Sequence, residues 1–211
     1  AKSGKSIALA DAARNAVMAG YNVLFVTLEN SMKITAERID SGFAKIAFNE
    51  MGNNIMAVNK KIKEMSQLCG KLKLHEFPSG TCRPSDITRL VNKHRAKGIV
   101  FDLVVVDYLD IMAPDYRTDN DIANSKSIYV DVRAIAQREG FAILSATQTN
   151  REGAKNAKSG VAGATDVAED YNRIRIPYIV ISINASDDEK KNGEARLHFA
   201  ASRNQEGDIT I

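Results

Sequence analysis

The chain has 211 residues, 44% of them hydrophobic, so it can bury one substantial core and a single domain is expected. Its 29 basic and 26 acidic residues leave a net charge of +3, too mild to indicate nucleic-acid binding from composition alone. No apolar run approaches the length of a membrane span and no signal peptide is visible. Cys69 and Cys82 are too few for a zinc cluster or a disulfide framework, which favours reduced thiols in a cytosolic setting.

The first feature in chain order is the second half of a phosphate-binding loop, A-K-S-G-K-S, followed at once by a helical pattern. It completes the motif G-x-x-x-x-G-K-[ST], whose first glycine would lie two positions before Ala1, so we expect a strand and half the loop to precede this sequence. Backbone N–H groups of such a loop cradle phosphates, a lysine adds charge and a serine hydroxyl ligates Mg²⁺. The expected nucleotide-binding residues are Ser3, Gly4, Lys5, Ser6 and Ile7, with Ser6 also a metal ligand.

The next elements alternate between helices and buried strands. The helix ends at Gly20, and residues 22–28 (N-V-L-F-V-T-L) form the first apolar strand. Ser31 is expected to cap a helix to about Met51, followed by a lysine-rich helix over residues 53–68 and a strand over 72–77. Ser85 and Asp86 then open a helix to about residue 97.

The second half contains further strands with polar residues at their ends. An apolar strand over residues 103–106 ends at Asp107, and another covers residues 141–146. A polar stretch, 114–126, precedes a helix over 127–138, and residues 150–164 are predicted to be a mobile loop. Strands over 178–183 and 194–200, joined by a charged turn, are expected to extend the sheet in antiparallel fashion. The pattern predicts a three-layer α/β P-loop domain with a mainly parallel sheet.

Polar side chains at three strand ends complete the predicted site. Asp107 is positioned to hold Mg²⁺, because ligands of open α/β sheets bind at the carboxyl ends of the strands. Glu29 directly follows the first strand and is a candidate base for the attacking water, although a helix-capping acid is an equal alternative by spacing alone. Gln148 can contact the γ-phosphate or its water, and ATP with Mg²⁺ is the expected ligand.

The order of these motifs resembles the C-terminal, RecA-like ATPase domain of DnaB-type replicative helicases over almost the whole chain. V-T-L-E-N-S resembles the family's S-L-E-M-S/P, V-V-V-D-Y-L-D its V-I-D-Y-L-Q, and A-T-Q-T-N-R its S-Q-L-N-R. The resemblance implies a catalytic base at Glu29, a metal-associated acid at Asp107 and a γ-phosphate sensor at Gln148. A-A-S-R-N-Q-E-G resembles A-K-Q-R-N-G-x-x-G, which makes Arg203 an arginine finger for the neighbouring subunit's site.

Two substitutions depart from the family pattern: Ala201 stands where a lysine is usual, and Asp110 where a glutamine is usual. The resemblance implies a hexameric ring in the cytoplasm of a bacterial or phage-infected cell, with no membrane association. A primase and a helicase loader would act through an N-terminal region absent from this sequence. A divergent phage or prophage branch would account for the departures.

Single-stranded DNA would meet two loops of such a ring. The candidate phosphate contacts are basic residues, although each one taken alone is better explained as part of a solvated surface loop: Arg117, Lys126, Arg151, Lys155 and Lys158. A recombinase of the RecA/RadA type or a KaiC-like ATPase shares most of the motifs. A ring-assembly module that binds nucleotide without unwinding DNA is the alternative from another functional class.

Overall fold

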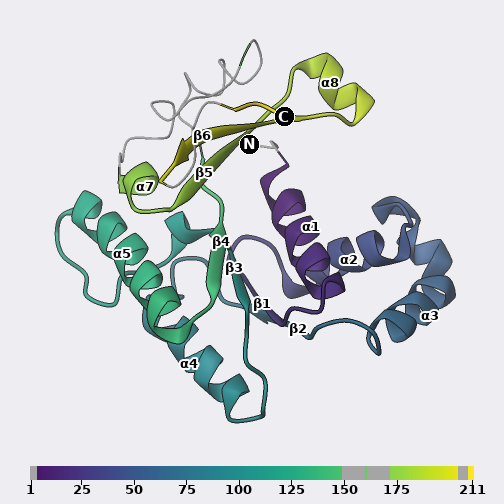
Figure 1. Ribbon diagram of the computed structural model, residues 1–211, viewed down its shortest axis with the longest axis horizontal. Helices are drawn as coiled ribbons and strands as arrows, with labels where there is room; N and C mark the ends of the chain where they lie inside the picture. The colour runs from purple at the N-terminus through teal and green to yellow at the C-terminus, as the bar shows by residue number, and fades with distance from the viewer. Residues whose placement is uncertain (1–3, 149–159, 161–171, 204–208) are drawn as a thin grey trace.

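The computed structural model describes residues 4–148, 160, 172–203 and 209–211, and it has three layers (Figure 1). The central sheet has four parallel strands in the order β2-β1-β3-β4. These are β1 (Val23–Thr27), β2 (Leu72–Glu76), β3 (Leu103–Asp107) and β4 (Ala142–Ser145). The predicted parallel α/β architecture is confirmed.

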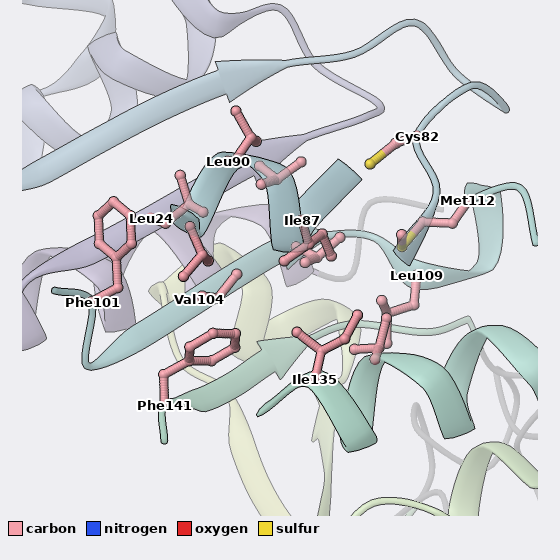
Figure 2. Close-up of a cluster of buried hydrophobic side chains, with 14 of the residues drawn as sticks. Leu24, Cys82, Ile87, Leu90, Phe101, Val104, Leu109, Met112, Ile135 and Phe141 are labelled. Carbon is pink, nitrogen blue, oxygen red and sulfur yellow. The ribbon is translucent and has the colours of Figure 1, made fainter. Parts of the chain in front are cut away.

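Helices cover both faces of this sheet, because the two middle strands are apolar on both sides. The helices are α1 (Lys5–Met18), α2 (Met32–Ala44), α3 (Ile55–Met65), α4 (Pro84–Arg95) and α5 (Asp121–Glu139). Val23, Phe25 and Val105 pack against α1 and α2, where Leu9, Ala13 and Ile39 are buried. The opposite face of these strands packs against α4 and α5 through Leu24, Val26, Val104 and Val106. Figure 2 shows Leu24 and Val104 facing Ile87, Leu90 and Ile135. Burial on both faces explains why these strands are continuous hydrophobic runs.

The region after α2 differs from the predicted long helix. The helix ends at Ala44 because Lys45 adopts a left-handed conformation, φ 56°, and the Ser41 hydroxyl donates to the carbonyl of Ile46 at 2.6 Å. A 3₁₀ segment, η1 (Phe48–Asn54), then leads into α3. The predicted N-cap is confirmed: the Ser31 hydroxyl accepts from the backbone N–H of Ile34 at 3.3 Å.

Two other helix boundaries differ from the prediction. Helix α4 begins at Pro84, with Arg83 as its N-cap, rather than at Ser85. Helix α5 begins at Asp121 because the Asn120 side chain accepts from the N–H of Ala123 at 3.0 Å. The polar stretch before α5 is therefore shorter than predicted.

The C-terminal strands form a separate hairpin, so the prediction that they extend the central sheet is wrong for the described residues. Strand β5 (Ile179–Asn184) pairs antiparallel with β6 (Arg196–Ser202), and the short helix α7 (Asn172–Arg175) precedes them. The expected turn between the strands contains a helix, α8 (Asp187–Asn192), because Ser186 and Glu189 form a capping box. Helix α7, just before the hairpin, lies close to α5 (Figure 1). Arg133 Nη1 of α5 donates to the carbonyl of Ile176 at 3.1 Å.

Across the described ranges, no helix is long and apolar enough to cross a membrane.

Candidate active site

The carboxyl ends of the middle strands lie beside one another at one edge of the sheet. Thr27 at the end of β1 pairs with Asp107 at the end of β3, and the N–H of Leu28 donates to the Asp107 carbonyl at 2.9 Å. Glu29 is the next residue after Leu28, and Gln148 follows the end of β4 by three residues. This is the edge at which open α/β sheets bind ligands.

Helix α1 starts at the predicted phosphate loop. Gly4 is its N-cap and adopts a left-handed conformation, φ 83°, in which a residue with a Cβ atom would be strained. Lys5 and Ser6 are half-buried, whereas Ile7 is 65% exposed. The free N–H groups and positive dipole end of the first turn suit an anion. Ser3 lies outside the described residues.

The pKa of Lys5 responds to the acidic residues that follow the strands. Burial lowers the pKa of the Lys5 ammonium, while the nearby carboxylates of Glu29, Asp110 and Asp107, in that order, oppose the shift. Three acidic groups therefore act on one half-buried cation. An anionic ligand bound beside Lys5 would oppose the lowering of its pKa in the same way as the carboxylates.

Asp107 is buried, at 2% exposure, and its carboxylate is held by a neighbouring loop. Asn30 Nδ2 donates to Asp107 Oδ2 across a long 3.5 Å contact, and the Thr27 hydroxyl donates to the Asn30 carbonyl at 2.7 Å. With one weak donor among the described residues, this buried carboxylate retains lone pairs for a cation or its waters. The residues described contain no group of three or more His, Cys, Asp or Glu side chains suited to a metal. Mg²⁺ needs no such group, since one carboxylate, a hydroxyl and nucleotide phosphates supply its ligands.

Tyr108 is the central residue of the cluster, and the sequence analysis missed it. The Lys5 ammonium lies 5.1 Å from the centre of its ring, and Gln148 Nε2 donates to its hydroxyl at 3.1 Å. Burial raises the pKa of Tyr108, and the hydrogen bond from Gln148 opposes that rise. The negative charges of Glu29, Asp110 and Asp107 also raise the pKa of Tyr108. The available signal was an aromatic residue directly after the strand-end aspartate.

Asp110 connects helix α5 with the segment that follows β4. Its carboxylate accepts from the Tyr129 hydroxyl of α5 at 2.6 Å and from the Thr147 hydroxyl at 2.7 Å. Thr147 is adjacent to Gln148, so Asp110 helps to fix the end of β4 relative to α5. The sequence marked this aspartate as unusual without indicating these partners.

The other predicted site residues that the structure describes make contacts elsewhere or are exposed to solvent, and the rest lie outside the described residues. Arg203 is exposed and contacts Tyr178 and the carbonyls of Arg175 and Pro177 at the open end of the hairpin. Arg117 is exposed before α5, and Lys126 is exposed on α5 itself. The predicted DNA contacts Arg151, Lys155 and Lys158 lie outside the described residues.

Comparison with known proteins gives concordant matches. The family model of the DnaB-like helicase C terminal domain matches residues 1–170. A DnaB-like replicative helicase of Enterobacteria phage T4 is 24% identical over 159 residues, which cover 71% of this chain and 33% of that protein. The chain therefore spans about a third of the length of this relative.

Two solved structures share the fold. One, described as an ATPase domain, superposes with a TM-score of 0.82 at 16% identity, covering 100% of this chain and 76% of that one. A DnaB-like replicative helicase, whose structure was described with its interactions with primase, gives a TM-score of 0.80 at 15% identity, covering 100% of this chain and 52% of that one. Both are RecA-like folds, in agreement with the predicted fold.

Proposed function

We propose, because this chain belongs to the family of DnaB-like helicase C-terminal domains, that it is the ATP-hydrolysing motor of a replicative DNA helicase. ATP would bind at the strand-end cluster, between neighbouring protomers of a hexameric ring. Its hydrolysis would drive movement along single-stranded DNA and separation of the duplex. Two features support the proposal: Lys5 and Gln148 both contact Tyr108, and the charges of Glu29 and Asp107 act on both Lys5 and Tyr108.

The first half of the mechanism is phosphate binding by α1. The N–H groups of its first turn and the Lys5 ammonium bind the terminal phosphates, as the left-handed Gly4 lets the chain turn into the helix. The Ser6 hydroxyl and the Asp107 carboxylate would hold Mg²⁺. Mg²⁺ held by these two side chains would offset the negative charge of the phosphates.

The second half is attack by water on the γ-phosphorus. The water oxygen forms the new bond to phosphorus as the bond to the bridging oxygen of ADP breaks, and the Glu29 carboxylate accepts the proton that water loses. The Gln148 amide orients the γ-phosphate or that water. Arg203 of a neighbouring protomer stabilises the negative charge that spreads over the phosphoryl oxygens.

The proposed partners follow from the same motor role. Single-stranded DNA would contact basic side chains of the ring through its phosphates, with Arg117, Arg151, Lys155 and Lys158 as the candidates. A primase and a helicase loader would bind outside this domain.

Replacing the proposed base tests the chemistry. In the full-length oligomer, Glu29→Gln should lower the ATPase kcat by about 10²–10⁴-fold, the range of a general base, while binding of a fluorescent ATP analogue persists. Lys5→Ala should abolish that binding. The exposed Glu64 forms an ion pair with Lys61 on α3, so Glu64→Gln is the matched control and should leave both measurements unchanged. Full turnover by Glu29→Gln would remove it as the base.

Dilution and DNA unwinding test the ring motor. Because a trans arginine is worth about 10³–10⁵ in rate, the specific ATPase rate should fall as the protein is diluted to monomers. A constant rate at monomeric concentrations would contradict a site shared between protomers. Unwinding of a forked duplex supports the helicase role; strand exchange between homologous duplexes would favour a recombinase, and nucleotide-dependent rings that unwind nothing would favour an assembly module.

A further inference from the structure

The guanidinium of Arg203 is held in place within its own protomer. The backbone N–H of Arg203 donates to the Tyr178 carbonyl at 3.0 Å, which continues the β5–β6 pairing by one position. Its side chain donates from Nε to the Pro177 carbonyl at 3.4 Å and from Nη2 to the Arg175 carbonyl. The guanidinium carbon also lies 5.7 Å from the centre of the Tyr178 ring.

The charge of Arg203 stays available for an external anion. Within the described part of the chain, all its contacts are with carbonyl oxygens and an aromatic ring. The other arginine of the hairpin differs, because Arg196 Nε pairs with the carboxylate of Glu189 at 2.9 Å. Among the described residues, Arg203 therefore combines a restricted side chain with a positive charge that no carboxylate contacts, which is the combination that recognition of a phosphoryl group requires.

Tyr178 is itself fixed by α5. Its hydroxyl accepts from Arg133 Nη2 at 3.0 Å and from Gln137 Nε2 at 3.1 Å, and the Arg133 guanidinium carbon lies 4.5 Å from the ring centre. The hydrogen bond and charge of Arg133 lower the pKa of Tyr178. The ring thus contacts two guanidinium groups, Arg133 from α5 and Arg203 from the hairpin.

The same face of α5 reaches the protomer's own strand-end cluster. Tyr129, Arg133 and Gln137 are spaced four residues apart and so lie on one face of the helix, which spans roughly 12 Å between the first and last. At one end, Tyr129 donates to Asp110, whose charge acts on Lys5. At the other end, Gln137 holds Tyr178.

We propose that Tyr178 is a positioning residue for Arg203, and that α5 connects it to the protomer's own nucleotide site. This inference rests on the proposed function, in which Arg203 acts in the neighbouring protomer's site. Tyr178 orders the arginine before it meets the neighbour's ATP, so less side-chain freedom is lost in the transition state. A shift of the α5 face with nucleotide state would move the arginine that serves the next site.

The first test separates Tyr178 from Arg203 by kinetics in the full-length oligomer. Tyr178→Leu removes the ring and the hydroxyl, and should lower kcat by about 10–100-fold, since a displacement of about 1 Å costs about 100-fold, with KM for ATP within about twofold. Tyr178→Phe keeps the ring beside Arg203 and should lose less. The double variant with Tyr178→Leu and Arg203→Ala should have the same kcat as Arg203→Ala alone, because Tyr178 acts through Arg203. Tyr21, exposed and outside the site, supplies the control Tyr21→Leu, expected to match the parent.

A mixed-ring experiment tells positioning from general damage. Protomers with Lys5→Ala cannot bind ATP but carry an intact Tyr178 and Arg203. Adding them to Tyr178→Leu protomers should raise the ATPase rate per ATP-competent protomer several-fold, because the added arginines serve the impaired neighbours. Absence of rescue would overturn the inference, since Tyr178 would then act only within its own protomer.

The outcomes also distinguish this inference from the proposed function. Full turnover by Arg203→Ala would refute the role of Arg203 in the neighbouring site, and therefore also its positioning by Tyr178. A defective Arg203→Ala beside a fully active Tyr178→Leu would refute only the positioning role. If a size measurement shows that Tyr178→Leu fails to assemble, two milder variants replace it. Gln137→Ala removes one hydrogen bond to the Tyr178 hydroxyl, and Tyr178→Phe removes the hydroxyl itself. Unchanged kcat in both variants would refute the positioning role of Tyr178.

Discussion

Replacing Asp110 by asparagine should change stability and nucleotide affinity in opposite directions. The carboxylate of Asp110 accepts two short hydrogen bonds, from Tyr129 and Thr147. Asp110→Asn keeps the shape of the side chain but removes the charge, and it turns one acceptor oxygen into an NH₂ donor that faces a hydroxyl. One charge-assisted bond becomes neutral and the other is lost or inverted.

The magnitude follows from the strength of such bonds. A hydrogen bond to a charged group contributes about 1.5–3 kcal/mol, against about 1 kcal/mol for a neutral pair. Because Tyr129 is buried, the free energy of unfolding should fall by about 1.5–3 kcal/mol. For a chain of this size each kcal/mol shifts Tm by about 2–4 °C, so Tm should fall by about 3–12 °C.

Nucleotide binding should change with the opposite sign. Asp110 is one of three carboxylates that act on Lys5, so removing its charge weakens the repulsion of an anionic triphosphate. Thermal unfolding without nucleotide and titration with a fluorescent ATP analogue measure the two effects. Tyr129→Phe is the control, since it removes one hydrogen bond with the carboxylate still charged; it should be destabilised with unchanged affinity. An Asp110→Asn variant with parental Tm and parental affinity would refute this reasoning.

Three further predictions concern regions outside the site. His75 and His94 lie 3.0 Å apart between their Nε2 atoms, and burial, with nearby lysines, lowers the pKa of both. The folded protein therefore binds protons less readily than the unfolded chain, whose imidazoles titrate near about 6.5, so the free energy of unfolding should fall as pH drops below that value. Urea denaturation at a series of pH values measures this, and parent-like acid sensitivity in a variant carrying His75→Gln and His94→Leu would contradict it. Ile87→Ala, at a fully buried position, should lower the free energy of unfolding by about 2–5 kcal/mol by the same denaturation; a loss below about 1 kcal/mol would mean that the α4 side of the core repacks. Burial raises the pKa of Cys82 to about 12, so a thiol reagent at mildly alkaline pH should modify Cys82 only after unfolding, while rapid labelling of the native protein, mapped by mass spectrometry, would show that this core opens.

Local patterns predicted the two middle strands of the central sheet because β1 and β3 are nearly continuous apolar runs. Both faces of β1 and β3 are covered by helices, so nearly every residue is buried and the signal is strong. Glu29 and Asp107 could be located at strand ends for the same reason. Their nearness to Lys5 is an expectation from the rule that parallel strands end at one edge, and the charges of both carboxylates act on the Lys5 ammonium.

Helix ends were less well predicted, because single residues decide them. The left-handed Lys45 ended α2 although the apolar pattern continued, and the Asn120 cap started α5 within a stretch read as a loop. The capping box of Ser186 and Glu189 was visible in the sequence but was read as a charged turn. These errors come from local hydrogen bonds, to which hydrophobic periodicity is insensitive.

The sequence by itself determined the chemical inventory: a cationic loop at a helix start, acids after apolar strands and an arginine after the last strand. Only the tertiary structure decided how these groups are supported. Tyr108 lies beneath Lys5, Asp110 joins two elements, and Tyr178 ties Arg203 to α5, through contacts between residues far apart along the chain. Such contacts depend on how packed layers orient each side chain, and no short-range spacing along the chain encodes that orientation.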